Sequence, residues 1–199
     1  MILRGVDWAA VLGGCTVGAL ILAGCVAFTS DAPPLSYLRL GLVALAAAAA
    51  FVLDEPAAAA VDAVPRTRRH RTAVRTAVVV LPFAIWAGGI GALAQKVSVA
   101  PVGALLVEGG GVLTVTVALG AILRMAGRSE PGEIVSVVMC TSVLALLVFN
   151  PPPHLGTPFP LDGDWTASTV LWAAITVAGA ILVVAASRDP YLPSGRFGH

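Results

Sequence analysis

Long apolar runs alternate with short polar segments along this chain of 199 residues. Six of these runs approach the length of about 20 helical residues that crosses the ~30 Å hydrocarbon core of a bilayer. We predict membrane spans at residues 9–29, 36–53, 72–94, 101–126, 132–149 and 167–187. The runs are continuous rather than alternating, which favours helices over the strands of a membrane barrel. The pattern therefore predicts an all-α membrane protein in which residues 1–199 form one six-helix bundle.

The composition of the chain supports this class. Hydrophobic residues make up 58% of the chain and charged residues 12%, which is about half the usual charged share of a soluble domain. The formal net charge is only +1, whereas a protein that binds nucleic acid concentrates a surplus of Lys and Arg on one face. We therefore expect the lipid bilayer as the surrounding medium and no nucleic-acid partner.

The distribution of Lys and Arg predicts the orientation of the bundle. If the N-terminus lies in the cytoplasm, ten of the 12 Lys and Arg residues fall on the cytoplasmic side, and Arg39 and Lys96 fall on the outer side. Basic residues concentrate in the cytoplasmic segments of membrane proteins. We therefore predict a multi-pass protein of the plasma (cell) membrane with both termini in the cytoplasm.

The first apolar run carries a second possible interpretation. Residues 22–25 read LAGC, which resembles the processing site of a lipoprotein with Cys25 as the lipidated residue. Gly14 and Gly18 form a pair of small residues four positions apart, which suits packing between membrane helices. We expect this run to remain as the first span, with lipidation at Cys25 as the alternative.

The most polar stretch of the chain joins the second and third predicted spans on the cytoplasmic side. Asp54 can cap a helix start, Glu55 suits the positive end of a helix dipole, and Pro56 is tolerated in a first turn. A short cytoplasmic helix of about ten residues is therefore expected before Pro65. So short a helix is marginal in water and needs a membrane surface or a protein partner to lie on.

Basic residues follow this expected helix and complete a candidate docking segment. The residues expected to contact a partner are Asp54, Glu55, Pro56, Val61, Asp62, Val64, Arg66, Arg68, Arg69 and Arg71. Arg residues near a membrane surface also attract anionic headgroups, by about 1 kcal/mol each. In the simplest alternative, the basic run is only a signal of topology.

Two charged residues are predicted to lie inside the membrane. Glu108 lies about 10 Å below the outer boundary at Pro101, counting ~1.5 Å per helical residue, and an unpaired carboxylate at that depth is costly. Arg39 enters the second span from the same side, and its long side chain extends toward that depth. We expect an ion pair between the two residues, with a proton or cation site at Glu108 as the alternative.

Glycines follow this carboxylate directly at Gly109, Gly110 and Gly111. Such a run permits very close approach of another helix, or a local break in the helix. Tight packing between helices and a functional kink beside a cavity are both open at this stage. Pro82 and the glycines at 88–91 are likewise expected to be able to kink the third span.

The outer segment 150–165 contains five prolines, which favour an extended chain. We expect Phe159, Leu161 and Trp165 to return from it to the membrane interface. Asp162 and Asp164 are more often solvated or capping groups than metal ligands in such a loop. The three Cys residues show no Cys-x-x-Cys pair and no neighbouring His, so no metal site and no cofactor are predicted.

Six spans with both ends inside, and a short capped helix between spans two and three, resemble the type-2 permease subunits of ATP-binding-cassette transporters. The segments VLDEPAAAAVDAVP at 52–65, EPG at 130–132 and ASRDP at 186–190 also resemble actinobacterial membrane proteins that accompany such transporters. In that family a coupling helix in this loop contacts the ATPase, and two membrane subunits form the translocation path. The resemblance implies a cytoplasmic ATP-binding subunit and a second membrane subunit, identical or different, as partners.

The leading hypothesis is therefore the membrane-spanning, permease-type subunit of an ATP-driven exporter, coupled to a separate ATPase through residues 54–75. The chain has no GxxxxGK[ST] phosphate-binding motif, so we do not expect it to be an enzyme itself. The alternative is an accessory or structural subunit of a larger membrane complex without its own transport path. An ion-coupled carrier centred on Glu108 is a third hypothesis.

Overall fold

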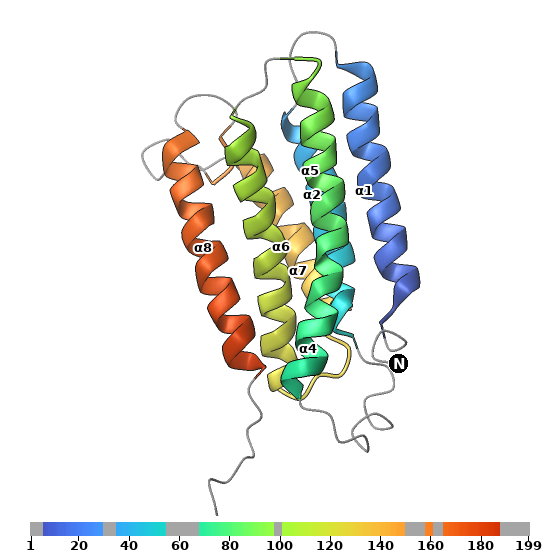
Figure 1. Cartoon of the computed structure of the whole chain (residues 1–199), viewed down its shortest axis with the longest axis vertical. Coiled ribbons are helices and arrows are strands. Elements are labelled where there is room, and N and C mark those ends of the chain that lie inside the picture. Colours follow the sequence, from blue (N-terminus) through green and yellow to red (C-terminus); the bar gives the residue numbers. More distant parts are fainter. Residues whose placement is uncertain are drawn as a thin grey trace, which may run out of the picture.

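Six long apolar helices run side by side in the computed structural model of the chain (Figure 1). The structure describes residues 6–29, 35–54, 68–97, 101–149, 158–160 and 165–187, with the side chains of 68–71 excepted. The helices long and apolar enough to cross a membrane cover residues 8–28, 35–53, 72–94, 102–125, 132–149 and 165–186. The predicted spans end within two residues of these bounds. The all-helical fold with six candidate spans is confirmed, and the described residues contain no strand.

Four of the six spans are single α-helices: α1 (Trp8–Phe28), α6 (Val102–Met125), α7 (Gly132–Phe149) and α8 (Trp165–Ala186). The second span consists of α2 (Leu35–Ala50) and the 3₁₀ turn η2 (Phe51–Leu53). The third span begins within α4 (Arg68–Thr76), passes through the 3₁₀ turn η3 (Ala77–Val79) and continues as α5 (Val80–Ala94).

Local chemistry explains several helix boundaries. Asp7 caps α1 by accepting a hydrogen bond from the Ala10 amide at 3.2 Å. Helix α6 ends in a Schellman motif, in which Gly127 has a φ of +88° and the amide of Arg128 donates to the Leu123 carbonyl at 3.0 Å. Because a glycine pays no steric cost at positive φ, the chain can leave the helix sharply at that point.

Pro82 explains the interruption in the third span. Proline has no amide hydrogen and clashes with the carbonyl four residues earlier, which here belongs to Val78 at the centre of η3. A 3₁₀ turn therefore precedes Pro82, whereas the kink expected in this span stays a prediction. At residues 88–91 the α-helix continues without a break to Ala94.

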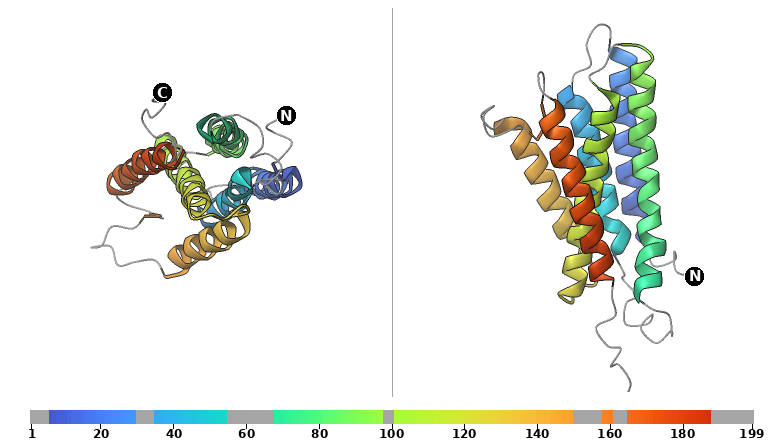
Figure 2. Two further views of the ribbon diagram at one scale, coloured as in Figure 1. Left: turned by 90° about the horizontal axis from the view of Figure 1, so that it is seen from below. Right: turned by 60° about the vertical axis from the view of Figure 1, so that its left-hand side comes forward.

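Helices α2 and α6 form the centre of the bundle. In the view along the helices, α8, α6, α2 and α1 lie in a row, with α5 on one side and α7 on the other (Figure 2). In the most apolar window of the second and fourth spans 61% of positions are buried, against 28% or less in the other four. The four outer helices therefore present most of their apolar side chains to the surroundings of the bundle.

The first helix packs closely on the second through glycines. A Cβ atom at Gly14 would lie 2.8 Å from Ala48 Cβ, and one at Gly18 would lie 2.7 Å from Leu45 Cδ2. Both distances are shorter than real contacts, so a side chain at either position requires a shift of α2 or of the Leu45 side chain. The packing role predicted for this pair of small residues is confirmed.

The two ends of the bundle differ in their content of arginine. Helix α1 begins and α8 ends at the same end, where α4 also lies (Figure 1). We call it the basic end, because Arg75 is in the last turn of α4 and Arg124 in the last turn of α6. The opposite end, where α5 is followed by Lys96, is the Lys96 end. The cytoplasmic location of the basic end stays a prediction, and the short helix predicted before Pro65 lies outside the described residues.

Candidate functional site

The predicted ion pair between Arg39 on α2 and Glu108 on α6 is present, and both side chains are buried, at 0% and 1% exposure. The Arg39 Nε atom donates to Glu108 Oε1 at 2.9 Å, and Nη2 donates to Oε2 at 3.0 Å. Two parallel bonds of this kind fix the planes of both groups relative to each other. The pair therefore joins the two central helices of the bundle at a defined register.

Arg39 also holds the segment that precedes α8. Its Nη1 donates to the Phe159 carbonyl at 3.2 Å, and Nη2 donates to the Pro160 carbonyl at 2.9 Å. The guanidinium lies over the rings of Phe159 and Trp165, 5.1 and 5.8 Å from their centroids. We call Arg39, Glu108 and residues 158–160 the Arg39 clasp.

The third carbonyl of the clasp is bound by α8. Pro158 O accepts hydrogen bonds from Ser168 Oγ at 2.9 Å and from Trp172 Nε1 at 2.7 Å. Phe159 is buried, and its ring lies 5.3 Å from that of Trp172. Phe159 therefore packs into the bundle, the return of Phe159 and Trp165 to the membrane interface stays a prediction, and Leu161 lies outside the described residues.

The clasp has the properties of a structural element rather than of an ion relay. Four of the five N–H donors of Arg39 are used, and both carboxylate oxygens of Glu108 accept from it. Releasing Glu108 to exchange a proton or a cation would leave Arg39 buried without its counter-ion, which is costly in an apolar medium. The geometry thus favours the structural interpretation of this pair over the ion site.

The glycines after Glu108 provide close contact with two neighbouring helices. A Cβ atom at Gly109 would overlap the indole of Trp86 from α5, and one at Gly111 would lie 2.5 Å from Cε3 of Trp172 in α8. At Gly110 the nearest atom is Phe83 Cε2 at 3.7 Å, an ordinary contact. Helix α6 continues as an α-helix through all three residues, so the run does not break the helix and instead packs tightly.

A second polar junction lies at the basic end. Asp54 Oδ1 accepts a hydrogen bond of 2.7 Å from the amide of Gly132, the first residue of α7. The carbonyl of Asp54 accepts a bond of 3.0 Å from Nη1 of Arg75, whose side chain is 1% exposed. Asp54 therefore connects the second, third and fifth spans, and we call these three residues the Asp54 junction.

Gly132 is required by the geometry of this junction. A Cβ atom there would lie 2.5 Å from Asp54 Oδ2 and 2.6 Å from Phe51 Cδ1. The free amides at the start of a helix need acceptors, and a carboxylate also complements the positive end of the helix dipole. Asp54 Oδ1 thus binds α7, far along the chain. The cap predicted for the segment that follows Asp54 stays a prediction, because that segment lies outside the described residues. Asp54 and Gly132, which belong to two of the segments that carry the resemblance, therefore meet at this point.

Burial raises the pKa of the Asp54 carboxyl from 3.8 to about 6, although the Gly132 amide lowers it. The negative charges of Glu130 and Asp7 raise this pKa further, and Arg124 lowers it. A pKa raised by folding gives stability that is fully present below pH ~3.8 and is lost as the pH rises through about 6.

We therefore expect Asp54→Asn, which keeps an acceptor for Gly132 without the charge, to raise the melting temperature at pH 7.5. At pH 4.5 this gain over the wild type should be much smaller, because the wild-type carboxyl is then mostly protonated. Thermal unfolding of both proteins in one detergent at the two pH values measures the difference. An equal difference at both pH values would show that the carboxyl does not titrate in this window.

Most of the predicted docking residues cannot be placed relative to this junction. Glu55, Pro56, Val61, Asp62, Val64 and Arg66 lie outside the described residues, and Arg68, Arg69 and Arg71 belong to α4 without described side chains. The sequence interpretation missed the buried roles of Arg75, Gly132 and Trp86. The apolar neighbours of Arg75 in the third span were the available signal that this Arg differs from the rest of the basic run.

The six apolar helices and their buried polar junctions define the class as a multi-pass helical membrane protein. No protein-family model, no curated protein and no solved structure matches the chain. Within the described part of the chain, no three His, Cys, Asp or Glu side chains gather where they could hold a metal ion.

Proposed function

We propose that the chain is a membrane-spanning, permease-type subunit of an ATP-driven transporter, coupled to a separate cytoplasmic ATPase through residues 54–75. The observation that carries this proposal is the Asp54 junction, which fastens both ends of that segment to the bundle. Asp54 is held by the first turn of α7, and Arg75 is held by the carbonyl of Asp54.

This anchoring suits a segment that transmits force. A partner that pushes on residues 55–67 acts on two fixed points, Asp54 after the second span and Arg75 in the third span, and Asp54 is bound to the start of the fifth span. Coupling between distant sites requires such contiguous contacts between packed elements. In this proposal the basic end faces the cytoplasm of a cell whose plasma membrane holds the bundle, in agreement with the distribution of basic residues.

A second membrane subunit, identical or different, completes the proposed transporter. The facing surfaces of α2 and α6 are packed along the described bundle, so the translocation path would lie between subunits rather than within one. The apolar outer faces of the helices suit contact with such a subunit. An amphipathic or hydrophobic compound is the expected cargo, and export is the expected direction.

Co-purification of an ATPase tests the proposal. The tagged chain is purified from its native membrane in mild detergent, and bound nucleotide-hydrolysing activity is measured. One variant has residues 57–64 replaced by a flexible Gly/Ser linker, and a control has the outer residues 150–157 replaced in the same way. We expect ATPase activity with the wild type and with the control, and none with the 57–64 variant. An ATPase that stays bound to that variant would contradict the role of this segment.

An accessory or structural subunit of a larger membrane complex is the second candidate. The Arg39 clasp favours it, because the described intramembrane charges of the clasp are fully engaged with protein groups and offer no free site to a passing solute. Purification of a wild-type complex without any ATPase would support this candidate over the transporter subunit.

A further inference from the structure

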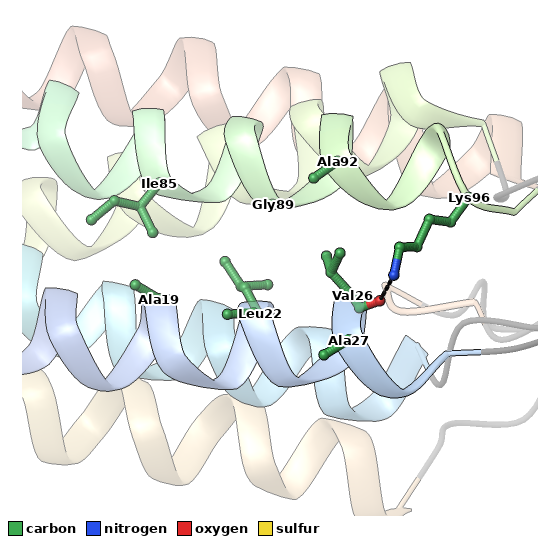
Figure 3. A pocket seen from close by; sticks show the side chains of 9 residues that line it. Ala19, Leu22, Val26, Ala27, Ile85, Gly89, Ala92 and Lys96 are labelled. Carbon is green, nitrogen blue, oxygen red and sulfur yellow. Dashed lines mark hydrogen bonds between the residues drawn. The ribbon is translucent and has the colours of Figure 1, made fainter.

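A groove with a volume of about 490 Å³ lies between α1 and α5. Figure 3 shows Ala19, Ala27 and Ala92 on its walls and Lys96 at one end. Ala19, Ala23 and Ala27 recur every four residues on α1, so they occupy one face of that helix. Small side chains on this face and Gly89 with Ala92 on the other wall leave the space between the helices unfilled.

Leu22 lines the groove and points from α1 toward α5 (Figure 3). A Cβ atom at Gly89 would lie 3.0 Å from Leu22 Cδ1, so α1 and α5 are in close contact where Leu22 faces Gly89. Every residue that lines the groove except Lys96 is apolar or glycine. A polar solute would lose its hydrogen bonds to water there without compensation, whereas a hydrocarbon chain would lose nothing.

Along the helix axes, the groove is about as long as one membrane leaflet is thick. From Ile85 to Lys96 the chain advances by about 16 Å at ~1.5 Å per helical residue, which is about half of the ~30 Å hydrocarbon core. It occupies the half of the bundle next to the Lys96 end. An occupant that fills it therefore has its apolar part in one leaflet and its head at the level of Lys96.

Lys96 gives this end of the groove a positive charge. Its Nζ donates to the carbonyl of Val26, in the last turn of α1, at 2.9 Å (Figure 3). An ammonium group has three donors, so this bond leaves two for another acceptor. The side chain is exposed and forms no salt bridge with a described carboxylate, whereas Arg39, the other basic residue on this side, is engaged by Glu108.

We propose that this groove binds one acyl chain of an anionic phospholipid from the leaflet at the Lys96 end, with the headgroup bound to Lys96. The apolar lining and the one-leaflet depth select the chain, and the charge of Lys96 selects the anionic headgroup. One cation near an anionic surface corresponds to a preference of about fivefold over a zwitterionic lipid. The inference does not rest on the proposed ATPase partner.

Photo-crosslinking in vesicles tests this site. The full chain is reconstituted in phosphatidylcholine with a trace of phosphatidylglycerol or phosphatidylcholine that carries a diazirine in its acyl chain, and labelled peptides are identified by mass spectrometry. We expect α1 and α5 residues of the groove to be labelled about fivefold more by the phosphatidylglycerol probe. Lys96→Gln should bring this ratio close to one, because Gln keeps a donor for Val26 but not the charge. Lys96→Arg should retain the preference.

Two variants of α1 separate the groove from the general lipid surface. Ala23→Phe fills the groove and should abolish its labelling by both probes, whereas Val17→Phe adds the same ring at an exposed position that does not line the groove. Equal labelling by both lipids in the wild type, or an unchanged ratio in Lys96→Gln, would overturn the proposal. A groove that neither probe labels in a dimeric protein would also overturn it, because a second copy of the chain would then cover the groove.

Discussion

Replacing Glu108 with Ala should destabilise the bundle by about 3–5 kcal/mol, the usual cost of leaving one charge of a buried ion pair without its partner. Arg39 would remain fully buried with only the carbonyls of Phe159 and Pro160 as described hydrogen-bond acceptors and no counter-ion. Arg39→Met should cost a similar amount for the same reason. The free energy of unfolding in detergent micelles, measured by denaturant titration, gives both values.

The double variant Arg39→Met with Glu108→Leu distinguishes the pair from two independent contributions. It leaves no unpaired charge, so its cost should be far below the sum of the two single costs. The exposed Glu133→Gln serves as a control and should cost no more than about 1 kcal/mol, because it removes only a first-turn charge of α7. Additive single costs would contradict the existence of the pair in the folded protein.

A variant in which the two charges are exchanged tests the carbonyls that bind Arg39 as well as the ion pair itself. Arg39→Glu with Glu108→Arg restores opposite charges, but it also places a carboxylate beside the carbonyls of Phe159 and Pro160. We therefore expect only partial recovery of stability. Full recovery would mean that these carbonyls do not contribute to the clasp.

Gly109→Ala should destabilise the protein by about 1–3 kcal/mol because the added methyl group overlaps the buried indole of Trp86. The indole cannot move freely, since its Nε1 donates to the Leu105 carbonyl at 2.9 Å. A Gly to Ala change in a helix interior would otherwise be stabilising by up to ~1 kcal/mol. The sign of the measured change therefore reports directly on this contact.

Gly110→Ala is the matched control in the same helix. Its Cβ would meet only Phe83 Cε2 at 3.7 Å, so we expect no loss and a gain of up to ~1 kcal/mol. Denaturant titrations of the two variants, with tryptophan fluorescence as a second readout, compare the positions. Equal changes in both variants would contradict the close approach of Trp86 to α6.

The number and the ends of the spans could be predicted from the sequence because they depend on local properties. The length of an apolar run is set by the thickness of the hydrocarbon layer, so counting residues is sufficient. The Arg39–Glu108 pair could be predicted for a similar reason, because two charges at the same depth in an apolar medium need each other. The salt bridge between Arg39 and Glu108 in the structure confirms that expectation.

The partners of the clasp and of the Asp54 junction could not be predicted in this way. The carbonyls of Phe159 and Pro160 belong to a Pro-rich segment, and no periodicity in its sequence predicts their hydrogen bonds with Arg39. The capping rule identified Asp54 as a cap for the segment that follows it, but it gave no indication of the bond between Asp54 and Gly132, which lies 78 positions away. The glycine run after Glu108 predicted close approach but not which Trp side chains approach.

Accessibility of residue 62 tests the central claim, which is that the basic end and the segment 54–75 face the cytoplasm. Asp62→Cys and, as the outer control, Thr157→Cys are introduced into a chain whose three native cysteines are replaced by Ala. A membrane-impermeant thiol reagent is applied to intact and to permeabilised cells. We predict labelling of Thr157→Cys in intact cells and of Asp62→Cys only after permeabilisation. Labelling of Asp62→Cys in intact cells would contradict the orientation, and with it the proposed contact with a cytoplasmic ATPase.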